Sequence, residues 1–146
     1  MARFPVFEHL TPDEERAVLS MARRRKFARN EVIFHEGDPG DTVHLVDKGH
    51  VAVRVSTPDG DVATVRVLGP GDLFGELAVL DPGPRMASMV ALDKVETLVM
   101  HRDVIEQLRR DHPSVDRVLL HASQREVKRL SLALTEVLYT PVPTRL

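Results

Sequence analysis

The chain has 146 residues, enough for one domain with a substantial core and too few for two ordinary domains. It has no cysteine, which excludes disulfides, thiolate catalysis and iron–sulfur clusters held by cysteine. The net charge of −2 lacks the basic surplus of a domain that holds DNA by itself, and no apolar run approaches the roughly 20 residues that cross a bilayer.

The glycines divide the chain into three parts. All eight lie between Gly37 and Gly83, so a turn-rich middle separates two flanks without glycine. The first flank predicts a helix after Thr11, because Pro12 occupies the first helical position and Glu14 completes the spacing of a capping box. The basic run RRRK at residues 23–26 is expected to be a solvated face at the end of this helix.

The middle of the chain predicts short antiparallel strands. Valine alternates with polar or small residues along residues 51–55, and again along residues 65–67. The sequence PDG between these runs is a hairpin signal, and residues 86–101 form a further β segment. Several short strands at this turn spacing predict a sandwich or a barrel.

The second flank predicts two helices. A short one within residues 101–113 is stopped by Pro113, and Ser114 then caps a long helix that continues to about Tyr139. A two-chain seam is favoured, because this helix is longer than a small barrel can cover; an amphipathic helix packed on its own barrel is the alternative. The final residues 140–146, TPVPTRL, contain two prolines and predict a hinge. The two heptad rows of the long helix are Leu120, Val127 and Leu134, and Ser123, Leu130 and Val137.

The stretch FGELAVLDPGPRMAS, residues 74–88, predicts a nucleotide site. Its first residues can form one helical turn, whose free N–H groups attract an anion, and Gly75 permits close approach of a ligand. The turn DPGP brings back Arg85, whose planar cation suits phosphate oxygens. An ionised Glu76 only accepts hydrogen bonds, so it suits a ribose 2′-hydroxyl close to the phosphate. Further donors are the Ser88 hydroxyl and the backbone N–H groups near Met86 and Ala87.

Other interpretations of these residues are structural. Arg85 could be a surface arginine paired with Asp81. The seven histidines have no tight ligand spacing, so we expect them to be structural or solvated, with no metal site. No serine–histidine–aspartate or paired-carboxylate arrangement is visible from spacing, so we expect no catalytic residues and no enzyme.

The stretch FGELAVL…PRMAS resembles the phosphate-binding cassette of cyclic nucleotide-binding domains. Nearly the whole chain, including FEHLTPDE, VIFHEGDPGDTVHLVDKGHVAV and the closing TPVPTRL, resembles the effector domain of the cyclic AMP receptor protein (CRP/FNR) family of bacterial transcription regulators. The resemblance implies an α+β fold: an antiparallel, jelly-roll-like β-roll flanked by an N-terminal helix and a long C-terminal dimerisation helix, about residues 114–139. It also implies a binding domain over residues 1–139 and a hinge, residues 140–146, towards an absent helix-turn-helix domain.

The resemblance also implies roles for individual residues. Glu76 would accept from the ribose 2′-hydroxyl and Arg85 would bind the cyclic phosphate. Midway along the long helix, Ser131 would reach the base, whereas Leu130 departs from the polar residue familiar at its position. A threonine often stands at the place of Met86 in relatives that prefer cyclic GMP, so cyclic AMP is favoured here. The complete implied set is Phe74, Gly75, Glu76, Leu77, Arg85, Met86, Ala87, Ser88 and Ser131.

The function expected from the resemblance is sensing of a cyclic nucleotide. Cyclic AMP is the expected allosteric ligand, with no other cofactor, and its binding would shift helix pairing and the hinge to control DNA binding by the absent module. The expected partners are the nucleotide and a second copy of the chain, in the cytoplasm and without a membrane segment. The alternatives are a sensor of another signal, or control of a different output such as a channel or a kinase.

Overall fold

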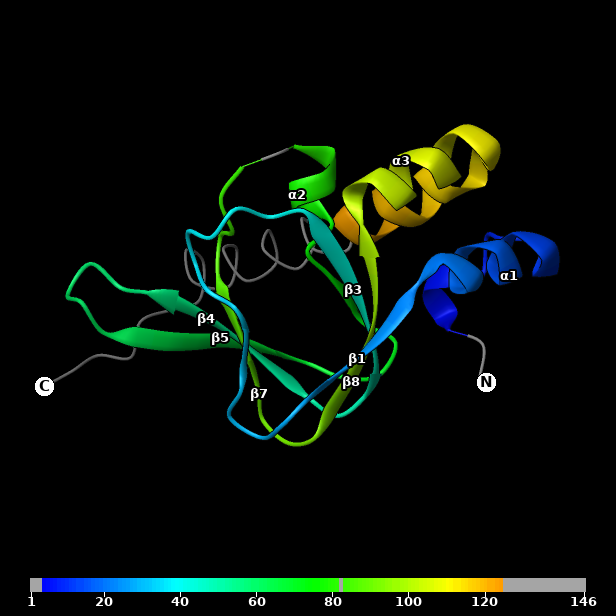
Figure 1. Ribbon diagram of the computed structural model, residues 1–146. Helices are drawn as coiled ribbons and strands as arrows, with labels where there is room; N and C mark the ends of the chain where they lie inside the picture. The colour runs from blue at the N-terminus through cyan, green and yellow to red at the C-terminus, as the bar shows by residue number, and fades with distance from the viewer. Residues whose placement is uncertain (1–3, 82, 125–146) are drawn as a thin grey trace, which may run out of the picture.

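Two facing sheets form the body of the protein (Figure 1). The computed structural model describes residues 4–81 and 83–124. Within these residues the strands form two antiparallel four-stranded sheets, in the orders β1-β8-β3-β6 and β2-β7-β4-β5. The strands are β1 Arg23–Phe27, β2 Val32–Phe34, β3 Thr42–Lys48, β4 Val51–Ser56, β5 Val62–Leu68, β6 Leu73–Phe74, β7 Ser88–Ala91 and β8 Val95–His101. The predicted antiparallel β-roll is confirmed.

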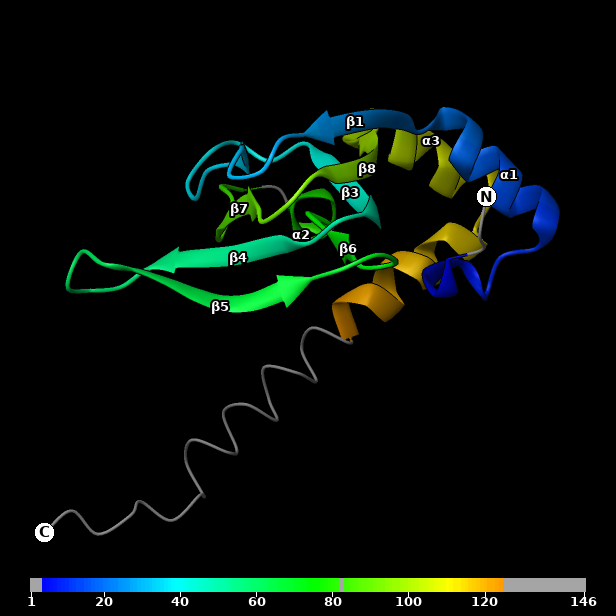
Figure 2. The same ribbon diagram turned by 90° about the horizontal axis from the view of Figure 1, so that it is seen from below.

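All the helices except the short one at Leu77–Leu80 gather at one end of the roll, and the β4–β5 hairpin projects from the other end (Figures 1 and 2). The helices are η1 Pro5–Phe7, α1 Pro12–Met21, α2 Leu77–Leu80, α3 Arg102–Asp111 and a further helix that begins at residue 114 and is described to residue 124. The predicted hairpin is confirmed, because a loop closed by a 2.8 Å hydrogen bond from the Thr57 N–H to the Asp61 carbonyl joins β4 to β5. None of the helices described is long and apolar enough to cross a bilayer.

Strands β3 and β8, in the middle of one sheet, are buried on both faces. Val43 and Leu45 of β3 pack with the helices, whereas Val46 points into the roll. From the helical side, Ile105 and Leu108 of α3 join the same cluster. A strand buried on both faces is apolar along its length, so it lacks the alternation that marks a half-buried strand. This explains why β4 and β5 could be predicted from alternation and β3 could not.

The N-terminal helix begins as predicted. The Thr11 Oγ1 accepts from the Glu14 N–H at 3.2 Å, and the Glu14 carboxylate accepts from the Thr11 N–H at 2.9 Å. These reciprocal bonds satisfy backbone donors that a helix start leaves without partners.

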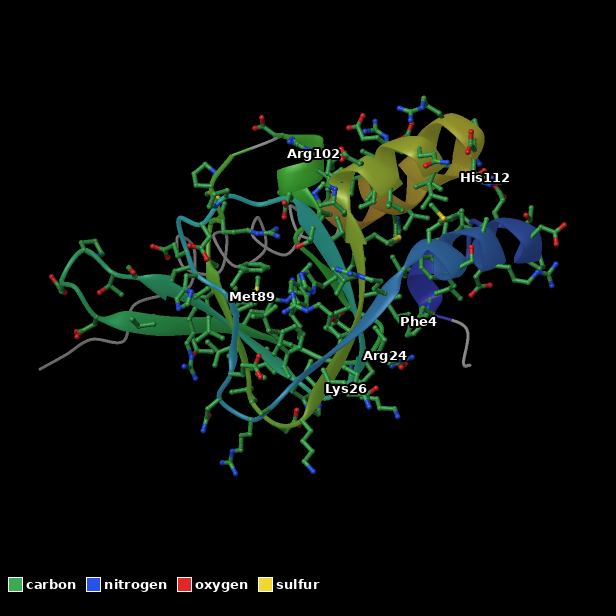
Figure 3. All side chains as sticks on the ribbon, in the orientation of Figure 1. Phe4, Arg24, Lys26, Met89, Arg102 and His112 are labelled. Carbon is green, nitrogen blue, oxygen red and sulfur yellow. The ribbon has the colours of Figure 1, made fainter. Side chains whose placement is uncertain are left out.

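The prediction that residues 23–26 lie at a helix end is wrong. α1 ends at Met21, and the basic run forms β1, which pairs with β8 (Figure 3). Backbone pairing with β8 satisfies the N–H and C=O groups, while Arg24 Nη1 reaches Asp47 at 2.6 Å and Glu96 at 3.1 Å. The four basic side chains are exposed, as predicted.

The helix that begins at residue 114 uses one face to pack on its own domain. Val115, Val118 and Leu119 are buried in the helical core cluster, whereas Leu120, a predicted heptad residue, is 57% exposed. The continuation of this helix to residue 139, the later heptad positions and the hinge lie outside the described residues.

Candidate ligand-binding site

The segment predicted to bind a nucleotide forms a tight loop between β6 and β7. After Phe74, Gly75 adopts φ +87°, and Leu77–Leu80 forms the predicted single helical turn. A Cβ at Gly75 would lie 2.6 Å from the Thr42 carbonyl oxygen and 2.8 Å from Arg85 Nη1. From the sequence we expected glycine here because a ligand approaches the backbone closely. In the structure, the Thr42 carbonyl and the Arg85 side chain already leave no room for a Cβ.

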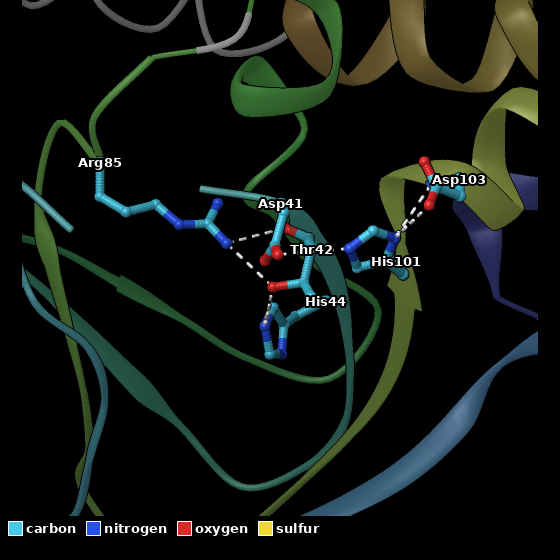
Figure 4. Close-up of polar contacts among 6 residues, drawn as sticks. All are labelled: Asp41, Thr42, His44, Arg85, His101 and Asp103. Atoms are coloured by element: carbon cyan, nitrogen blue, oxygen red, sulfur yellow. Dashed lines mark hydrogen bonds and ion pairs between the residues drawn. The ribbon is translucent and has the colours of Figure 1, made fainter. Parts of the chain in front are cut away.

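Arg85 is a buried, positioned cation and not a surface residue. Its side chain crosses to β3, where Nη2 donates to the Thr42 carbonyl oxygen at 3.0 Å and to Thr42 Oγ1 at 2.9 Å (Figure 4). Nη1 donates to the Gly75 carbonyl at 3.4 Å, and Cζ lies 4.0 Å from the centre of the Phe34 ring, in cation–π geometry. Among the described residues its hydrogen bonds therefore go to Thr42 and Gly75, and not to Asp81, as the surface interpretation required.

One donor of Arg85 differs from the others. The Nε–H is buried and makes no hydrogen bond within the described part of the chain. Burial lowers the pKa of the guanidinium, while the nearby carboxylates of Asp41, Asp38 and Glu76 act in the opposite direction. Arginine remains charged in proteins, so the loop holds a positive charge with one unsatisfied donor.

The loop between β2 and β3 holds the backbone of Arg85. The Gly37 N–H donates to the Arg85 carbonyl at 2.8 Å, and the Arg85 N–H donates to the Asp38 carbonyl at 2.8 Å. Pro39 and Pro84 form an isolated antiparallel bridge beside these bonds. From the sequence this loop is only part of the turn-rich middle of the chain; in the structure it holds the arginine in position.

A buried polar chain continues behind Arg85. His44 Nε2 lies 3.1 Å from Thr42 Oγ1, and Nδ1 lies 3.2 Å from Thr97 Oγ1. The His44 ring stacks on Phe74, with centroids 4.8 Å apart and planes 4° apart. Burial, together with the charges of Arg85 and Arg25, lowers the pKa of His44 to about 3, so the ring is neutral at neutral pH.

These contacts allow one continuous set of hydrogen bonds from Arg85 to Thr97. Arg85 can only donate, so Thr42 Oγ1 accepts from it and its own hydrogen is available to His44 Nε2. In that set the neutral ring carries its proton on Nδ1 and donates to Thr97 Oγ1. Thr42 Oγ1 therefore connects Arg85 to His44 in the interior of the roll.

Glu76 lies on the other side of the loop. It is the N-cap residue of α2, it is buried, and its charge acts on Arg85. It lines a pocket with residues of η1, β5, the β5–β6 turn, β6 and the helix that begins at residue 114: Val6, Arg66, Gly71, Asp72, Leu73 and Ala122. The structure thus places one buried carboxylate and one buried guanidinium around the same loop.

The remaining predicted residues lie in different surroundings. Phe74 and Ala87 are buried in the roll core, whereas Leu77 and Met86 are 48% and 77% exposed. The Ser88 Oγ accepts from the Glu36 N–H at 2.8 Å. Ser131 and Leu130 lie outside the described residues.

Sequence reasoning missed the residues that position Arg85. Phe34, Thr42 and His44 come from strands distant in sequence from residues 74–88. Thr42 and His44 stand out in the sequence only as polar residues within the run TVHLV, a pattern that fits a structural histidine equally well. Phe34 has no comparable signal.

Comparison with known proteins agrees with this geometry. A family model, the cyclic nucleotide-binding domain, matches residues 24–112, and the chain belongs to this family. A CRP-like cAMP-activated global transcriptional regulator of Mycobacterium tuberculosis is 32% identical over 145 residues, which are 99% of this chain and 65% of that protein. The crystal structure of the catabolite activator protein of Thermus thermophilus superposes with a TM-score of 0.84 at 35% identity, over 91% of this chain and 62% of that one.

The chain thus resembles cyclic AMP receptor proteins in sequence and in fold, and spans less than two thirds of the length of both relatives. A cAMP-dependent protein kinase regulatory subunit of Hypocrea atroviridis is also similar, at 34% identity over 71% of this chain and 21% of that protein. The family and the fold are therefore shared by proteins with different outputs.

Proposed function

We propose that this chain is the cyclic AMP-sensing effector domain of a CRP/FNR-type transcription regulator. The observation that carries the proposal is the buried Arg85, whose Nε–H has no hydrogen-bond partner among residues 4–81 and 83–124. A buried donor without a partner costs about 1–3 kcal/mol. A phosphate oxygen of the nucleotide would satisfy that donor and neutralise the charge.

Glu76 supplies the second half of recognition. A carboxylate near a phosphate site repels the anion unless the ligand also presents a hydroxyl donor. The ribose 2′-hydroxyl of a 3′,5′-cyclic nucleotide lies close to its phosphate, so Glu76 accepts from it while Arg85 holds the phosphate. Backbone groups and side chains around the loop complete the contacts: Phe74, Gly75, Leu77, Met86, Ala87 and Ser88.

Cyclic AMP is favoured over cyclic GMP. Met86 directly follows the arginine, and its side chain offers no hydroxyl to a guanine base. Ser131 on the long helix would donate to or accept from the adenine.

The output would pass through the long helix. The buried face of that helix, with Val115, Val118 and Leu119, supports packing on its own roll, and the exposed Leu120 supports pairing of a second copy on another face. Nucleotide binding would shift this pairing and, through residues 140–146, a DNA-binding module of the longer protein. Such a regulator works as a homodimer in the cytoplasm.

Calorimetric titration of the nucleotide-free chain tests the proposal. We expect saturable binding of cyclic AMP, weaker binding of cyclic GMP, and loss of both in Arg85→Ala. Arg29→Ala is the matched control, because Arg29 is an exposed turn residue remote from the loop, and it should bind as the wild type does. Folded wild-type protein that binds neither nucleotide would overturn the proposal.

A further inference from the structure

A second cluster of polar side chains lies away from the nucleotide loop. Glu8 and His9 follow η1 near the N-terminus, and His121 lies on the helix that begins at residue 114. One ligand atom of each residue lies within 4.8 Å of the other two. The rings of His9 and His121 meet edge to face, with centroids 5.5 Å apart and planes at 73°.

The spacing of these atoms is close to that of a metal site. Zinc bonds of about 2.1 Å at tetrahedral angles place neighbouring ligand atoms about 3.4 Å apart. His9 Nε2 and a Glu8 carboxylate oxygen are already 3.5 Å apart. A movement of about 1.4 Å at most would bring the largest separation to the tetrahedral value, which is within reach of a side-chain rotation.

The backbone on both sides of the cluster is held by the core. Phe7 and Leu10, which bracket Glu8 and His9, are 2% and 3% exposed. Leu119, two residues before His121, is 4% exposed and belongs to the same core cluster. Binding would therefore require ordering of side chains and little ordering of backbone, which favours affinity.

We propose that Glu8, His9 and His121 bind one divalent transition-metal ion of the zinc class, with water completing the coordination. Two imidazoles and one carboxylate are the ligand set that zinc accepts in sites with one open position. The bound ion would join the N-terminal segment to the beginning of the long helix, two parts of the chain separated by more than 100 residues. The site shares no residue with the nucleotide loop.

An ordinary ion pair is the competing explanation. A protonated His9 beside Glu8 would give the 3.5 Å contact without any role for His121. The contribution of His121 to metal binding therefore separates the two explanations.

The test is calorimetric titration of the tag-free 146-residue chain with Zn²⁺ in a buffer without chelators. We expect one equivalent to bind, and affinity to fall at least tenfold in His9→Ala and in His121→Ala, because even outer-shell changes cost metal sites about 10–100-fold. Glu8→Gln, which keeps the shape of the side chain, should also weaken binding. His35→Ala is the control: His35 is exposed in the β2–β3 loop and should not change the affinity.

A second measurement guards against variants that unfold. Zn²⁺ should raise the Tm of the wild type and of His35→Ala and leave the Tm of His121→Ala unchanged, because an ion that binds only the folded state stabilises it. Equal affinity in His121→Ala and the wild type would overturn the proposal, as would absence of a one-equivalent site in folded wild-type protein. Neither result depends on nucleotide binding, so this proposal can fail while the proposed function stands.

Discussion

Replacement of Gly75 by alanine tests whether the loop around Arg85 is built as tightly as the structure indicates. Two effects add at this position. A left-handed backbone, here φ +87°, costs an L-residue about 1–2 kcal/mol. The new Cβ would also lie 2.6 Å from the Thr42 carbonyl oxygen and 2.8 Å from Arg85 Nη1. Overpacking of this kind typically lowers the free energy of unfolding by about 1–3 kcal/mol more.

Gly60→Ala is a matched control for the backbone effect. Gly60 has φ +86°, and a Cβ there would meet no atom within 4 Å. Gly60→Ala should lower the free energy of unfolding by about 1–2 kcal/mol, and Gly75→Ala by about 2–5 kcal/mol. The difference measures the crowding of Thr42 and Arg85 alone.

The assay combines urea denaturation with a cyclic AMP titration of each folded variant. Gly75→Ala should bind cyclic AMP more weakly because the methyl group displaces Arg85, while Gly60→Ala should keep wild-type affinity. If the two variants lose equal stability and Gly75→Ala binds as the wild type does, the packing around Arg85 does not matter for binding and our reasoning is refuted.

Three further predictions concern separate contacts. Thr42→Val removes the hydroxyl between Arg85 and His44 and should cost about 1–3 kcal/mol in urea denaturation and weaken cyclic AMP binding; unchanged affinity would exclude a positioning role. Thr11→Ala removes the capping box and should cost about 0.5–2 kcal/mol with nucleotide affinity unchanged, since the cap is remote from the loop. The pKa of His44 is lowered from 6.5 to about 3 in the folded protein, so between these values the unfolded state binds the proton and the native state does not. The contribution of His44 to the free energy of unfolding is therefore fully present above pH 6.5 and decreases as the pH is lowered. At pH 5 this residue has reduced the free energy of unfolding by about 2 kcal/mol. His44→Gln should lose that part of the pH dependence, and an unchanged profile would contradict it.

Local rules predicted the parts of the fold that depend on neighbouring residues. The capping box at Thr11 and the hairpin after β4 follow from residues a few positions apart, and the structure contains both. The run at residues 23–26 could not be assigned in this way, because its conformation is set by pairing with partners in β8 that lie 70–76 residues later. The strand that contains Leu45 was missed because that strand is buried on both of its faces.

The same limit applies to the candidate site. Glu76 and Arg85 lie in one short stretch with a recognisable pattern, so they could be named from the sequence. The partners of Arg85, Thr42 and Phe34, are brought to it only by the folding of the sheets. The cluster of Glu8, His9 and His121 has no sequence signal, because its members come from distant parts of the chain.

The most direct test of the central claim, that Glu76 and Arg85 act on one cyclic nucleotide, is a titration with cyclic AMP and with 2′-deoxy cyclic AMP. Hydrogen bonds to charged groups contribute about 1.5–3 kcal/mol, so the wild type should bind the deoxy ligand about 10–150-fold more weakly. Glu76→Ala should bind the two ligands with nearly equal affinity. Equal affinity of the wild type for both ligands, or an undiminished preference for cyclic AMP in Glu76→Ala, would contradict the proposed recognition.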